Sequence, residues 1–164
     1  YKEVEGWTVH RKRAWTTVLS GAHYDMIDFS IAPYLETGTD ASQAGIRKWM
    51  AHLSTFVHSI DLSRAHPLDG WVKIHPEECL PSVLAVAEAD YCIYLADQRE
   101  LADSGSGDPI EGSLGIDLPE GRFDVSYFSP DSGVYSTSMR IAGGRGEIEL
   151  PEFRDDIVVR IKRT

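Results

Sequence analysis

The stretch RFDVSYFSPDSGVYSTSMRI (Arg122–Ile141) carries the clearest folding signal in the chain. Side chains over 123–128 alternate between an apolar and a more polar face, which is the period of a β-strand. SPDSG (Ser129–Gly133) then supplies turn chemistry, because its proline fixes one backbone dihedral and its glycine tolerates a positive one. The stretch therefore predicts a β-hairpin that joins residues 123–128 to residues 134–141.

Similar short runs, parted by Gly, Pro, Asp and Ser, fill the chain after Pro81. The last of them, DIVVRIKR (Asp156–Arg163), is interpreted as a half-buried edge strand that closes the domain. GGRG (Gly143–Gly146) stands between two runs and is interpreted as a β-turn. Roughly seven strands at this close spacing are typical of an antiparallel sandwich or barrel.

The N-terminal third has a different, helical periodicity. The first predicted helix runs from Thr8 to about Leu19, and we place its basic residues 11–13 off the apolar face. The second runs from Ser42 to about Ile60, with apolar residues at steps of three and four. Between them, YDMIDFSI (Tyr24–Ile31) is aromatic and β-branched, which predicts a strand.

This predicted strand creates a physical difficulty. A strand flanked by helices normally belongs to a parallel sheet that is buried on both faces. Only one such strand is visible before residue 60, so we expect its sheet partners to be encoded upstream, in a larger α/β protein. The segment 61–81 contains three prolines without a clear period and is interpreted as a linker or surface loop.

Composition narrows the classes of function. The net charge is −10, and residues 81–164 hold 16 of the 26 acids but only 8 of the 16 bases. An acidic surface of this kind argues against a nucleic-acid partner, whose phosphates need basic side chains. No apolar run reaches the roughly 20 residues of a membrane helix, and no metal-spaced histidine cluster or phosphate-binding glycine loop is present. We therefore expect no membrane partner, no metal and no cofactor.

The two cysteines, Cys79 and Cys92, form neither a CxxC pair nor a zinc site. Cys92 lies within an apolar run, where a small buried thiol is the simplest interpretation. A disulfide between the two stays an alternative, so the compartment is left open, with secretion or the periplasm among the choices.

Four stretches resemble, in the same order along the chain, the C-terminal part of barrel glycoside hydrolases of the cellulase-like superfamily. HRKRAWTTVLSGAHYDMIDFSI (His10–Ile31) is similar to their Arg-rich helix, small-residue turn and final barrel strand. FVHSIDLSR (Phe56–Arg64) is similar to the F-x-H-x-x-D-x-x-R motif that follows their next helix. YCIYL (Tyr91–Leu95) and DLPEGRFDVSYFSPDSG (Asp117–Gly133) resemble their small C-terminal β domain, sometimes labelled collagen-binding. The matching slots in the first stretch are filled by Arg13, Ala14, Trp15, Leu19, Ser20, Gly21 and residues 27–31.

The resemblance also has departures. Asp25 and Met26 stand where the family has an Asn pair, Ala22 replaces a second glycine, and Tyr127 replaces a tryptophan. The resemblance implies an α+β chain: terminal strand and helix units of a (β/α)8 barrel followed by an antiparallel β-sandwich. Residues 1–66 would be the end of the catalytic barrel, 67–80 a linker, and 81–164 the accessory sandwich.

The same resemblance implies glycoside hydrolysis, which uses two carboxyl groups at the C-terminal ends of barrel strands. One would lie upstream of this chain, and the second near YKEVEGW (Tyr1–Trp7), where Glu3 is the first choice and Glu5 the second. Solvated acids at a frayed terminus are the alternative for both. The partners would then be a carbohydrate substrate and the upstream remainder of the barrel.

The final barrel strand would reach the substrate mouth, with Asp28 bonding a sugar hydroxyl and Tyr24 or Phe29 offering a flat face to a sugar ring. His23 and Asp25 complete the predicted substrate-binding set. Alternatively, Asp28 is a carboxylate at a strand end that bonds nearby backbone donors. His23 and Asp25 would then be solvated residues at the end of an ordinary strand. For the β domain, we expect a role in buttressing the barrel; a non-catalytic carbohydrate- or protein-binding module is the alternative.

Overall fold

The computed structural model describes residues 4–25, 40–99, 103–136 and 138–164. Over these residues, two helices precede a mostly antiparallel sheet, which is an α+β arrangement. The elements are α1 (Val4–Leu19), α2 (Asp40–Val57), β1 (Ala65–Pro67), β2 (Cys79–Val86), β3 (Asp90–Asp97), β4 (Ser113–Ser129), β5 (Val134–Tyr135), β6 (Met139–Glu149) and β7 (Asp156–Arg163).

The strands form one sheet of order β1-β2-β3-β7-β4-β5, with β6 paired to β4 off this path. The long strand β4 pairs with β6 along most of its length and with β7 over Phe123–Phe128. The β4–β6 register shifts between Leu118 and Arg122, so that residues 119–121 stand opposite the single Gly143. A bulge of this kind bends the strand, and the sheet curls into a half-barrel.

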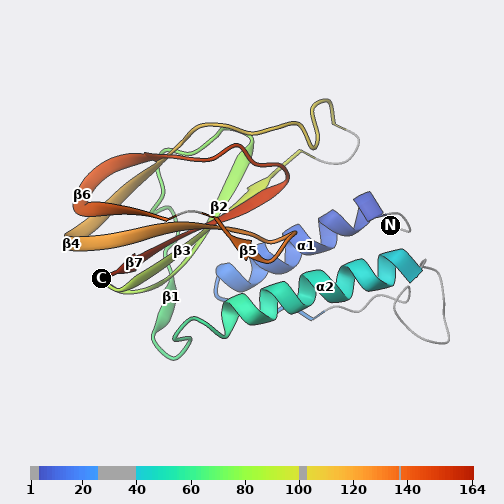
Figure 1. Ribbon diagram of the computed structural model, residues 1–164, viewed down its shortest axis with the longest axis horizontal. Coiled ribbons are helices and arrows are strands. Elements are labelled where there is room, and N and C mark those ends of the chain that lie inside the picture. The colour runs from blue at the N-terminus through green and yellow to red at the C-terminus, as the bar shows by residue number, and fades with distance from the viewer. Residues whose placement is uncertain (1–3, 26–39, 100–102, 137) are drawn as a thin grey trace.

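The curled sheet has an apolar cluster on each side. The cluster in its hollow is formed by the strands and the segments that join them, and its fully buried members include Ile93, Leu95, Leu114, Phe123, Val125 and Ile161. The outer cluster joins the sheet to the helices, which lie side by side along that face (Figure 1). It includes Trp15 and Leu19 of α1, Phe56 of α2, and Leu84, Tyr94, Phe128 and Val158 of the sheet.

Both predicted helices are present. Helix α1 begins at Val4, earlier than predicted, and α2 ends at Val57, although Ile60 beyond it is still buried. Placing Arg11 off the apolar face was wrong, because Arg11 is only 2% exposed. It lies four residues before the buried Trp15, so the two share one helix face.

The predicted hairpin at Ser129–Gly133 is confirmed, because Ser129 pairs with Val134 and Phe128 with Tyr135. Three other sequence predictions were wrong. Strand β7 is central, between β3 and β4, and both of its faces are buried because the helices cover the outer one. The GGRG run lies inside β6, and the predicted linker contains β1 and the start of β2.

The two cysteines are free and buried on opposite sides of the sheet. The alternative of a Cys79–Cys92 disulfide is therefore not realised. Among the described residues, no helix is both long and apolar enough to cross a membrane.

We expect Gly143→Ala to lower the free energy of unfolding by about 1–3 kcal/mol, the usual cost of overpacking. A Cβ at Gly143 would overlap the carbonyl oxygen of Pro119 in the bulge, so the backbone must shift. Gly146→Ala is the matched control in the same strand, because its Cβ would meet no heavy atom within 4 Å; its effect should stay within about 0.5 kcal/mol. Urea unfolding measures both, and equal effects would contradict the assigned bulge.

Candidate functional site

The predicted substrate-binding residues that the structure describes lie directly after α1. His23 and Tyr24 line a cavity of about 380 Å³ together with Leu53 of α2 and His58 just beyond that helix. His23 and Asp25 are exposed, whereas Tyr24 is partly buried against the outer cluster. The structure thus brings His23 and Tyr24 to one small, largely apolar cavity.

The structure describes little of the other predicted site residues. Glu3, Asp28 and Phe29 lie outside the described residues, and Glu5 belongs to the first turn of α1, where only the backbone is described. Helix α1 has 16 residues, which corresponds to a length of about 24 Å. The backbone of Glu5 and the residues 23–25 therefore lie toward opposite ends of this helix.

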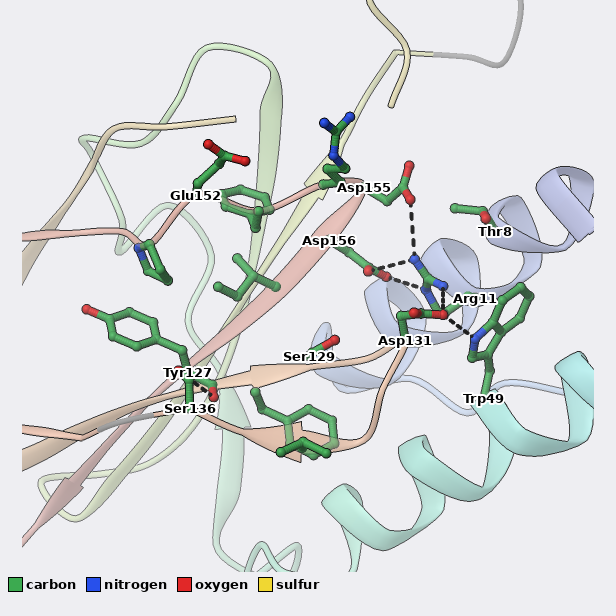
Figure 2. A pocket seen from close by; sticks show the side chains of 16 residues that line it. Thr8, Arg11, Trp49, Tyr127, Ser129, Asp131, Ser136, Glu152, Asp155 and Asp156 are labelled. Atoms are coloured by element: carbon green, nitrogen blue, oxygen red, sulfur yellow. Dashed lines mark hydrogen bonds and ion pairs between the residues drawn. The ribbon is translucent and has the colours of Figure 1, made fainter. Parts of the chain in front are cut away.

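The best-defined polar site among the described residues surrounds Arg11, between α1, α2 and the sheet (Figure 2). Arg11 donates from Nε and Nη2 to the two carboxylate oxygens of Asp156, each at 2.9 Å. Its Nη1 donates to Asp131 at 3.0 Å. The Trp49 Nε1 donates to that same Asp131 oxygen at 2.8 Å, and the guanidinium carbon lies 4.8 Å from the centre of the Trp49 ring.

Burial governs the electrostatics of this site. The Tyr94 hydroxyl donates to Asp156 at 2.9 Å, so this carboxylate is bonded from both α1 and β3. Burial raises the pKa of Asp156, while the charge and hydrogen bonds of Arg11 and the hydrogen bond of Tyr94 oppose that rise. Burial, followed by the charge of Asp156, also holds the pKa of Tyr94 well above its ordinary value.

A second buried arginine lies at the other end of the same interface. Arg160 of β7 donates to both oxygens of Asp90, from Nη2 at 2.6 Å and from Nε at 3.0 Å. It also donates to the carbonyl and hydroxyl oxygens of Ser59, just beyond α2, and to the Tyr135 hydroxyl. Between the two arginines stands a ring cluster formed by Trp15, Phe56, Tyr94 and Phe128, with centroids 5.0–5.8 Å apart.

A cavity of about 660 Å³ opens beside Arg11, and Trp49, Tyr127 and Asp155 also line it (Figure 2). Two of its carboxylates, Asp131 and Asp156, both accept from the Arg11 guanidinium. Among the described residues, no group of three or more His, Cys, Asp or Glu is arranged to hold a metal ion. The arrangement therefore fastens the helices to the sheet by charge and hydrogen bonds.

Sequence reasoning missed this network, although a signal for it was present. Arg11, Trp15 and Leu19 recur every four residues, so Arg11 continues the apolar stripe of α1. A charge on a buried stripe requires a buried partner. The identity of that partner could not be predicted, because Asp156 lies 145 residues away.

Comparisons with known proteins found no matching family model and no matching curated protein. Solved structures do match over 95% of this chain. One is a glycoside hydrolase family 5 protein from Bacteroides vulgatus ATCC 8482, with a TM-score of 0.66 and 13% identity. Another, described as a glycoside hydrolase, has a TM-score of 0.64 and 12% identity.

The chain spans 36% of the length of each of these two proteins. At identities this low, the similarity is evidence for the fold alone. The two helices and the curled sheet together therefore have the fold of a part of glycoside hydrolase chains.

We expect Arg11→Met to destabilise the protein by about 3–5 kcal/mol, because it leaves the buried Asp156 without its cationic partner. Arg13→Met, at an exposed position of the same helix, is the control and should change stability by less than about 0.5 kcal/mol. The double variant Arg11→Met/Asp156→Asn removes both charges and should recover part of the loss. Chemical denaturation measures all three.

The loss in Arg11→Met should also depend on pH. Burial raises the folded-state pKa of Asp156. Protonation of Asp156 therefore stabilises the folded protein at low pH, and this stabilisation is lost as the pH rises through the folded-state pKa. Removing Arg11 takes away a charge that opposes the rise, so the deficit relative to wild type should grow between about pH 4 and pH 8. A deficit that shrinks over this range would contradict a buried Arg11–Asp156 pair.

Both thiols should resist modification in the folded protein. Burial, with the nearby charges of Asp97 and Glu78, raises the pKa of Cys79 to about 12, and burial also raises the pKa of Cys92. Since the thiolate is the reactive form, an aromatic disulfide reagent at neutral pH should label neither cysteine until the protein is unfolded. Rapid labelling of the native protein would contradict the burial of these strands.

Proposed function

We propose that this chain is the C-terminal portion of a glycoside hydrolase acting on a polysaccharide or oligosaccharide, in which the sheet buttresses the catalytic barrel. The fold similarity supports the proposal, because it covers both helices and the sheet together. In this proposal residues 1–66 contain the end of the barrel. Residues 67–80, which include the last residue of β1 and the first two residues of β2, lead into the accessory β domain of residues 81–164.

The observation that carries the buttress role is the shared outer cluster. Trp15 is 0% exposed and contacts rings from both α2 and the sheet. The two buried arginines add directional bonds at either end of this cluster. A sheet that served only to bind ligands would need no such attachment, since domains joined for that purpose usually have smaller and more polar interfaces.

The length of α1 supports one order for the proposed active-site residues. If residues 24–31 form an extended strand as the sequence predicts, they would span about 26 Å, which is about the length of α1. Running back along the helix, such a strand would carry Asp28 and Phe29 toward the end of α1 that contains Glu5. We therefore propose Glu3 or Glu5 as the catalytic carboxylate, with Asp28 and Phe29 nearest to it.

His23, Tyr24 and Asp25 would then lie near the opposite end of the barrel from the carboxylates. They stay predicted substrate-binding residues, but ones that could contact only a distant part of a long substrate. The cavity lined by His23 and Tyr24 is largely apolar, which suits packing against neighbouring barrel elements.

The test is made on the gene product that includes the residues encoded before Tyr1. We expect it to release reducing sugar from a neutral polysaccharide, whereas the 164-residue chain alone should release none. Glu3→Gln or Glu5→Gln should lower kcat by about 10²–10⁴-fold, the range for losing a general acid or base. Asp61→Asn, at an exposed position after α2, is the control.

Two outcomes would contradict the proposal. Hydrolysis that persists at full rate in both glutamate variants would remove these residues from the catalytic machinery. Upstream sequence without further strand–helix units would leave the chain without a barrel, and the alternative of a non-catalytic binding module would then replace it.

A further inference from the structure

A groove of about 810 Å³ lies apart from the helix–sheet interface, and its described lining contains no residue of α1 or α2. One wall is the segment 70–74 that precedes β2, and the other is the paired strands β4 and β6. Its volume falls within the range of ligand-binding pockets. Because the helices cover the outer face of the sheet, a barrel packed on those helices would leave this groove open.

An aromatic side chain forms part of the groove. Trp71 is partly buried against the inner cluster and stacks on Tyr91, with ring centroids 5.1 Å apart and an interplanar angle of 17°. Tyr91 is only 5% exposed, so the tryptophan rests on a fixed support. An indole held in this way is pre-organised and loses little conformational entropy when a ligand packs on it.

The segment that carries Trp71 is itself fixed to the sheet. The Gly115 N–H of β4 donates to the Ile74 carbonyl at 2.9 Å, as an added strand would. A Cβ at Gly115 would lie 2.8 Å from the Ile74 side chain, so the close approach of this wall depends on that glycine. Ile74 nevertheless stays 45% exposed.

The charged groups in the groove balance each other. Lys73 and Arg145 offer donors, while Asp117 and Glu147 offer acceptors. Arg145 bonds Asp117 at 3.0 Å, and Glu147 accepts from the Ser113 hydroxyl at 2.8 Å. The formal charges of these four side chains cancel, so the groove provides no net field that would select an ion.

We propose that this groove binds a neutral oligosaccharide, at a site separate from the proposed active site. A sugar ring presents an apolar C–H face to an aromatic ring, and its hydroxyls both donate and accept at its rim. Trp71 supplies the flat face. The two cationic side chains of the groove supply hydrogen-bond donors, and its two carboxylates supply acceptors. The choice of sugar as ligand rests in part on the proposed function, whereas the site itself rests on the groove.

The test is calorimetric titration of the 164-residue chain with cellohexaose, xylohexaose and mannohexaose, with polygalacturonate as the anionic comparison. At least one neutral hexaose should bind and change the tryptophan fluorescence. Trp71→Ala should weaken that binding about tenfold, and Trp71→Phe, which keeps a ring, should restore most of it. Arg145→Ala, whose side chain is 86% exposed, should weaken binding severalfold without affecting folding.

Leu80→Ala is the control, because it removes a 51% exposed apolar side chain outside the groove. Absence of binding by the folded chain, binding of polygalacturonate alone, or affinity unchanged in both Trp71→Ala and Arg145→Ala would overturn the site. Hydrolysis by the longer gene product is a separate readout. A hydrolase whose C-terminal chain binds no sugar would refute the groove and leave the proposed function standing.

Discussion

The bonding of Arg11 to Asp156 is the interaction on which the arrangement of the molecule depends. It joins the first helix to the first residue of the last strand, so it links two residues that are 145 positions apart in the chain. A buried ion pair adds little net stability compared with an apolar pair of the same size, but it tolerates few other geometries. Its role is therefore to fix where the helices sit on the sheet, while the ring cluster around Trp15 supplies most of the apolar burial.

The curl of the sheet depends on a different constraint. Strand β4 pairs with β6 on both sides of a bend at residues 119–121, and with β7 beyond that bend. Gly143 opposite that bend leaves room for the Pro119 carbonyl. The bend creates the hollow in which the inner cluster lies, and it leaves the outer face free for the helices. The two apolar faces themselves come from the alternation of side chains, since Tyr127 of β4 belongs to the inner cluster and Phe128 to the outer one.

The sequence predicted what depends on local pattern and missed what depends on distant partners. The hairpin at Ser129–Gly133 and the stripe of α2 were predictable, because turn chemistry and helical period lie within a few residues. Strand β7 alternates as a half-buried strand does, yet helices from the other end of the chain bury its second face. For the site, the sequence identified candidate residues around the ends of α1, whereas the buried network of Arg11 required knowing that Asp156 faces it.

The distribution of charge separates the helix–sheet interface from the groove. On the helix side, the charged groups Arg11, Asp156, Arg160 and Asp90 are buried and bond one another, so little is left to offer a ligand. On the groove side, Arg145 and Asp117 pair while staying 86% and 57% exposed, and water screens such a pair until a ligand displaces it. Attachment requires groups withdrawn from solvent, and recognition requires groups within reach of it. This chain meets the two needs in separate regions, with the buried pairs between the helices and the sheet and the exposed pair on the paired strands β4 and β6.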